Sequence, residues 1–139
     1  MPFVRDEAHW LNRLSPDEWI RAAMGELRRA EEAYARKNGR AGLAGARRAA
    51  GMALNGALVI EPNEAWGRSY MDHLLALKND ESVSVRIREA STILLDAPLP
   101  GGALVALRSA HADERVLEAA RDMIAHAYAV VKRSHESAL

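Results

Sequence analysis

The sequence predicts an all-α protein, an up-and-down bundle of four or five helices in a single domain that spans residues 1–139. Three observations support this prediction. Apolar residues recur at helical spacing through most of the chain, helix-capping and helix-breaking residues separate the periodic segments, and no two segments are joined by a convincing hairpin turn. A chain of 139 residues is long enough to bury one core and too short for two comfortable domains.

The first helix is predicted for residues 15–37. It opens with the letters SPDE, in which Ser15 caps the helix, Pro16 takes the first helical position and Glu18 completes a capping box. The dipeptide Asn38-Gly39 ends it. Between these signals an apolar stripe runs at helical spacing, and its members are Trp19, Ala23, Leu27, Ala30 and Tyr34. We expect Trp19 to anchor this helix on the core.

The second helix, residues 40–60, is predicted to be the central and most buried element. After Arg48 it has no charged residue, and small or apolar side chains cover its whole circumference. Each glycine in it forfeits up to about 1 kcal/mol of helix propensity, so close backbone packing must compensate. The glycines are Gly42, Gly45, Gly51 and Gly56. We expect this small-residue face to meet a neighbouring helix or a second copy of the protein, and predict association through Ala49, Ala53 and Gly56.

Three further helices complete the predicted bundle. A short one contains Trp66, Tyr70, Leu74 and Leu77, with His73 in the same apolar stripe. The segment 82–95 alternates like a strand at first, but the alternation stops at Arg88, so we predict a helix. The loop APLPGG and the apolar run ALVAL then lead to a last helix, which is expected to start with Asp113 as its cap and to end near Arg133.

Composition limits the partners and the compartment. The chain has 19 basic and 19 acidic residues, whereas proteins that hold nucleic acid mainly through phosphates usually show a basic excess, so the charge does not favour RNA or a nucleotide as ligand. The absence of cysteine excludes disulfides and fits a reducing compartment. The start of the chain has no secretory signal, and the longest uncharged run, residues 49–60, is too short to cross a bilayer. We therefore expect a cytoplasmic protein without a membrane span.

One alanine-rich helix suggests a family. Residues 44–58 follow the pattern A-x-x-x-x-A-A-x-x-A-L-x-x-x-L, preceded by ELRRAEEAYA and followed by a short helix with DHLLAL. In helix order and in this pattern the chain resembles the HEPN superfamily, the higher eukaryotes and prokaryotes nucleotide-binding domains. The resemblance implies an up-and-down bundle that commonly dimerises, and thus a homodimeric binding or regulatory module.

Active members of that superfamily cleave RNA without metal through an R-x4-6-H motif. The stretch RDMIAHAY matches this motif with Arg121, Asp122, His126 and Tyr128. The resemblance implies that His126 is a general acid or base and that Arg121 clamps the phosphate, which suits imidazole and guanidinium chemistry. Arg68 and His73 match the same spacing a second time.

Two considerations favour a module without catalysis. With 16 arginines and five histidines in the chain, roughly two matches arise by chance. On one continuous helix, side chains five residues apart point about 140° away from each other, so Arg121 and His126 converge only if the helix breaks or a partner subunit completes the site. His73 lies in an apolar stripe and is expected to be a core histidine.

Two alternatives stay open beside this interpretation. One is a metal-independent endoribonuclease that uses Arg121 and His126. The other is a tetratricopeptide-like scaffold for a protein partner, because one segment matches the second half of such a repeat at Gly45, Ala50, Leu54, Ala57 and Pro62. The other histidines lack ligand spacing and no phosphate-binding glycine loop occurs, so neither a metal nor a cofactor is expected.

Overall fold

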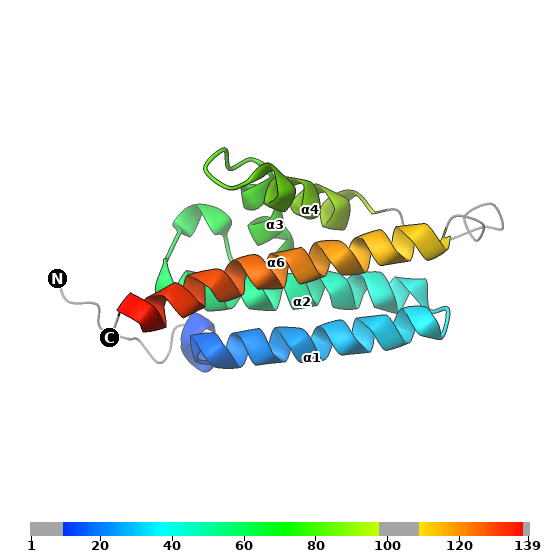
Figure 1. Ribbon diagram of the computed structural model, residues 1–139, viewed down its shortest axis with the longest axis horizontal. Coiled ribbons are helices and arrows are strands. Elements are labelled where there is room, and N and C mark those ends of the chain that lie inside the picture. Colours follow the sequence, from blue (N-terminus) through cyan, green and yellow to red (C-terminus); the bar gives the residue numbers. More distant parts are fainter. Residues whose placement is uncertain (1–9, 98–108, 138–139) are drawn as a thin grey trace.

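The computed structural model describes residues 10–97 and 109–137 (Figure 1). Within these ranges the chain is an all-α bundle without a β-strand, which confirms the predicted fold class. The two 3-10 turns are η1 (Trp10–Arg13) and η2 (Glu64–Trp66). The α-helices are α1 (Pro16–Ala35), α2 (Gly39–Ile60), α3 (Tyr70–Lys78), α4 (Val85–Asp96) and α6 (Ser109–Ser137).

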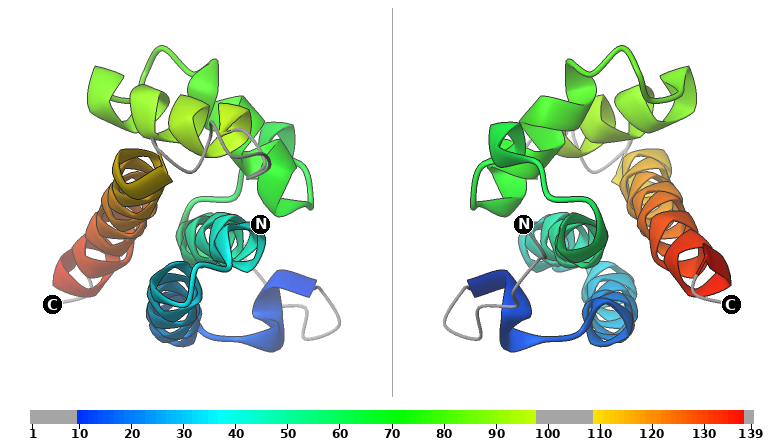
Figure 2. Two further views of the ribbon diagram at one scale, coloured as in Figure 1. Left: turned by 90° about the vertical axis from the view of Figure 1, so that its right-hand side faces the viewer. Right: turned by 90° about the vertical axis from the view of Figure 1, so that its left-hand side faces the viewer.

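The three long helices form the body of the molecule. Helix α2 runs antiparallel to α1, and α6 lies beside the pair (Figure 1). The short helices α3 and α4 lie across one side of this body and bring the chain back toward the end where α6 begins (Figure 2). Because α2 contacts α1, α6, α3, α4 and η1, it is the central element that the sequence predicted.

Local signals explain where the helices begin. The Ser15 hydroxyl accepts the backbone N–H of Glu18, whose carboxylate accepts the N–H of Ser15, so the predicted capping box is present. Asn38, Ser69 and Ser84 cap α2, α3 and α4 in the same manner with their side-chain oxygens. The helix predicted for 82–95 is confirmed, with Ile87 and Leu94 buried. A strand would place Val85 on the same face as Ile87, but Val85 is 58% exposed.

The glycines of α2 let side chains of other helices approach its backbone. The Tyr34 ring of α1 packs over Gly42, and the Tyr70 ring of α3 packs over Gly51, where a Cβ would lie 2.2 Å from the Tyr70 Cγ. Gly56 lies against the backbone of Pro16 and the side chain of Trp19. Close packing is therefore the compensation for the lost helix propensity.

The prediction that the small-residue face of α2 associates with a second copy is wrong. Ala49 and Ala53 are fully buried within the chain, and Gly56 is covered by α1. The neighbouring helices of the same chain occupy this face, because its small residues allow them to pack closely against the α2 backbone. No part of this face is left for a second subunit. Trp19, 7% exposed, does anchor α1: its indole N–H donates to the Leu11 carbonyl oxygen at 2.8 Å.

The start of α3 and both ends of α6 differ from the prediction. Trp66 lies in η2 and not in the third helix, because Gly67 adopts a positive φ of 66° and Ser69 caps α3 three residues after Trp66. Helix α6 begins at Ser109, so Asp113 lies inside it and not at its cap; the intervening alanines are strong helix formers. The helix also continues past Arg133 to Ser137, since no glycine or proline stops it. The run ALVAL and most of the APLPGG loop lie outside the described residues.

Candidate functional site

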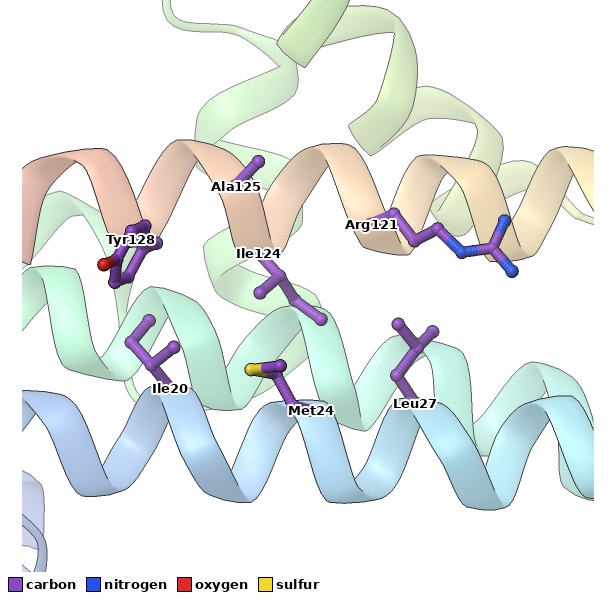
Figure 3. Close-up of a pocket in the computed structure, with 7 residues that line it drawn as sticks. All are labelled: Ile20, Met24, Leu27, Arg121, Ile124, Ala125 and Tyr128. Atoms are coloured by element: carbon purple, nitrogen blue, oxygen red, sulfur yellow. The ribbon is translucent and has the colours of Figure 1, made fainter.

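An apolar groove runs along the junction of α1 and α6. Residues one or two helical turns apart on each helix line it; the labelled side chains of α1 point toward α6, and Ile124 and Tyr128 of α6 point toward α1 (Figure 3). The groove has a volume of about 470 Å³. Its lining consists of Ile20, Met24 and Leu27 on α1 and of Arg121, Ile124, Ala125 and Tyr128 on α6. Two of the four residues singled out in RDMIAHAY, Arg121 and Tyr128, thus lie in one groove.

The groove has a buried floor and exposed rims. Ile20 and Ile124 belong to the core and form the floor, whereas Met24 is 50% and Tyr128 49% exposed. Large apolar side chains so exposed on opposite sides of an apolar recess are typical of an interaction surface and not of a solvated face. The exposed thioether of Met24 can also adapt its shape to a partner.

Arg121 closes one end of this groove and is already paired. Its Nη2 lies 3.6 Å from Oε1 of Glu31 on α1, and its Nη1 lies 3.9 Å from Oε2 of Glu114 on α6. All three side chains are well exposed, so each pair contributes little to the free energy of unfolding. The groove is therefore apolar along its length, with opposite charges at one end.

Asp122 belongs to a different contact. Arg86 of α4 binds its carboxylate with two parallel hydrogen bonds, Nε to Oδ2 at 3.1 Å and Nη2 to Oδ1 at 2.9 Å. This pair joins α4 to α6. Asp122 thus faces α4, while the adjacent Arg121 faces α1.

His126 is half-buried and does not line the groove. It stands five residues after Arg121 on an unbroken helix, which separates the two side chains by about 140° around the axis. Burial lowers the pKa of His126, and the nearby Arg133 lowers it further, while Glu61 opposes the shift. Within one chain, the structure therefore brings Arg121 together with Tyr128, but not with His126.

The second motif match is part of the core, as expected for His73. Its imidazole is fully buried, with Nδ1 2.8 Å from the Trp66 carbonyl oxygen and Nε2 2.7 Å from Oδ1 of Asn55. The rings of Trp10, Trp66 and Tyr70 surround it at centroid distances of 6.2–6.5 Å. Arg68 lies over the Trp10 ring, 5.5 Å from its centroid, and so stacks outside this aromatic cluster.

The α1 side of the groove was missed in the sequence. The predicted stripe of α1 contained Leu27 but left out Ile20 and Met24, which follow each other at i and i+4. The sequence does contain this pattern, because Ile20, Met24 and Leu27 form a second apolar row at helical spacing beside the predicted stripe. An apolar face wider than one neighbouring helix can cover indicates either a second neighbour or an exposed surface.

In residues 10–97 and 109–137 no three metal-ligating side chains gather, and no helix in this part combines the length and hydropathy needed to cross a bilayer. Comparison of the chain with family models, with curated proteins and with solved structures found no match.

Proposed function

We propose that the protein is a HEPN-like helical-bundle module that acts by binding and regulation without catalysis, and that it works in the cytoplasm as a homodimer joined through the groove between α1 and α6. The observation that supports this proposal is the exposure of Met24 and Tyr128 on the two rims of an apolar groove. Such a surface is stabilised when a partner removes it from water.

A second copy is the partner that the groove fits best. In a two-fold interface the same surface meets itself, so it must hold both protruding side chains and the recess that receives them. The groove has both, with Met24 and Tyr128 above a floor that includes Ile20. It also has both signs of charge, since Arg121 and Glu31 lie at one end. The zero net charge of the chain adds no overall repulsion between copies.

The contacts of the RDMIAHAY residues favour binding over catalysis. Arg121 already engages two carboxylates, and Asp122 is held by Arg86. A clamp for a phosphate needs a guanidinium whose donors can turn to the ligand, close to the histidine that moves the proton. The ribonuclease alternative therefore requires a partner subunit to place its His126 near Arg121.

Multi-angle light scattering tests the proposal. At tens of micromolar the wild-type protein should have the mass of a dimer, and Met24→Glu and Tyr128→Glu should give monomers, because each places a charge in the apolar interface. Leu75→Glu is the matched control: Leu75 of α3 is 52% exposed but lies outside the groove, so this variant should stay dimeric. Far-ultraviolet circular dichroism should show the same helicity in all four proteins.

Three outcomes would contradict the proposal. A wild-type monomer at this concentration would exclude the homodimer and leave the scaffold for a different protein as the alternative. Groove variants that remain dimeric would place the interface elsewhere. A control that dissociates as readily as the groove variants would mean that any added acid disrupts the protein.

A further inference from the structure

A second cavity opens between α3, α4 and α6, and it shares no lining residue with the α1–α6 groove. Its volume is about 680 Å³, within the range of small-molecule sites, about 300–1,000 Å³. The consecutive helices α3 and α4 meet α6 at this cavity. Its shape therefore depends on how these three helices pack together and not on one loop.

Basic side chains from all three helices line this cavity. Lys78 is the last residue of α3, Arg88 belongs to α4 and Arg115 to α6. Glu89 is the one acidic residue in the lining, while Lys78 also lies 3.8 Å from Asp96 outside it. The lining thus has an excess of positive charge in a protein whose total charge is zero. Such local charge attracts an anion into a recess.

The guanidinium groups have donors to spare. The Nε–H of Arg88 is buried, and no acceptor contacts it in the described part of the chain. Neither Arg88 nor Arg115 makes a side-chain hydrogen bond or ion pair with any residue in ranges 10–97 and 109–137. Buried donors are nearly always paired in native proteins, because the loss of water must be compensated. This argument applies to the buried Nε–H of Arg88, which also interacts electrostatically with Asp80, whereas Arg115 is exposed. Together the two guanidinium groups offer donors at one recess to a ligand with several acceptor oxygens.

We propose that this cavity binds a phosphate-bearing small molecule. Arg88 and Arg115 would donate hydrogen bonds to phosphoryl oxygens, and Lys78 would add a compact positive charge. Phosphate is favoured over a single carboxylate, since three cations suit a group with more than one negative charge and three free oxygens. Val85 and Ile93, which also line the cavity, provide an apolar wall for the rest of the molecule.

Isothermal titration calorimetry with inorganic pyrophosphate, at low and fixed ionic strength, tests this site. Wild-type protein should bind it, and Arg88→Gln and Arg115→Gln should each raise Kd about tenfold or more, as expected for the loss of a charged donor. Arg88→Lys should give an intermediate Kd, because it retains the charge but not the planar fork. Glu89→Gln should lower Kd several-fold by removing the opposing carboxylate, a gain that misfolding does not produce.

Arg36→Gln is the matched control. Arg36 pairs with Glu32 on α1 and does not line the cavity, so its removal lowers the total charge equally and should leave Kd unchanged. The proposal is overturned if wild-type protein does not bind pyrophosphate, if Arg36→Gln weakens binding as much as Arg88→Gln, or if Glu89→Gln fails to tighten it. Equal affinity for citrate would also overturn it, since carboxylates would then satisfy the site as well as phosphates.

Discussion

His73 of α3 and Asn55 of α2 form a buried polar pair, with the imidazole Nε2 2.7 Å from the amide oxygen. The other ring nitrogen, Nδ1, faces the carbonyl oxygen of Trp66. Burial lowers the pKa of His73, so the neutral ring predominates in the folded protein. A neutral ring has a single N–H, which donates either from Nδ1 to the Trp66 carbonyl oxygen or from Nε2 to the Asn55 amide oxygen, according to its tautomer. The pair therefore joins α2 to α3 without a buried charge.

This arrangement predicts that acid destabilises the protein. In the unfolded chain the imidazole takes up a proton near pH 6.5, whereas the folded protein resists protonation to a lower pH, so protons favour unfolding. The stabilisation is complete above about pH 6.5 and is lost as the pH falls below that value toward the folded pKa. His126, whose pKa is also lowered, contributes in the same direction.

Urea denaturation between pH 7.5 and 5 measures this dependence. We expect the free energy of unfolding to decrease as the pH is lowered, by up to about 1.4 kcal/mol per pH unit for each histidine that titrates. His73→Gln should flatten the curve, and His126→Gln is the control for the share of the other histidine. If the wild-type and His73→Gln curves run parallel, His73 does not titrate differently in the two states.

The packing of Tyr70 over Gly51 predicts that one methyl group destabilises the protein. In Gly51→Ala the new Cβ would lie against the base of the Tyr70 ring, so the ring or α3 must move, at a cost of about 1–3 kcal/mol. Gly25→Ala in α1 is the matched control, because nothing lies within 4 Å of its Cβ. This control should stabilise the protein by about 0.5–1 kcal/mol. Thermal unfolding of both variants measures the difference; the same sign for both would contradict the assigned packing.

Trp19 should be among the most costly residues to truncate. Trp19→Ala removes a buried ring and the hydrogen bond to Leu11, and we expect it to cost about 3–5 kcal/mol in the free energy of unfolding. Trp19→Phe retains most of the ring contacts, so its cost should be nearer the hydrogen bond alone, about 1 kcal/mol. Denaturant midpoints measure both. A negligible shift for Trp19→Ala would mean that η1 and α1 do not hold together through this residue.

The RDMIAHAY motif predicts a simple test for catalysis. We expect no cleavage of structured or single-stranded RNA in EDTA by the purified protein, because Arg121 and His126 point away from each other and Arg121 engages Glu31 and Glu114. Loss of a general acid or base lowers a rate by about 10²- to 10⁴-fold. Cleavage that His126→Ala and Arg121→Ala both abolish, with helicity intact, would establish the ribonuclease alternative. Cleavage that survives both substitutions would come from a contaminant.

The helices follow from signals within a few residues of each other, and these could be predicted. The capping box at Ser15 and Glu18 and the apolar stripe of α1 depend on residues three or four positions apart. The start of α6 was predicted wrongly because Asp113 has the side chain of a good helix cap. It lies, however, within a run of helix-forming residues, and the helix begins four residues earlier, at Ser109.

The sequence by itself thus determined the all-α class, the central place of α2 and the core position of His73, because apolar periodicity and charge-free runs decide which faces are buried. The tertiary structure alone decided what covers each face. It covered Gly42 and Gly51 of α2 with the rings of Tyr34 and Tyr70, left Met24 and Tyr128 exposed, and brought Lys78, Arg88 and Arg115 to one cavity. These relations join residues far apart in the chain, and they depend on how helices cross and on which side chains fill the space between them, which no local pattern encodes.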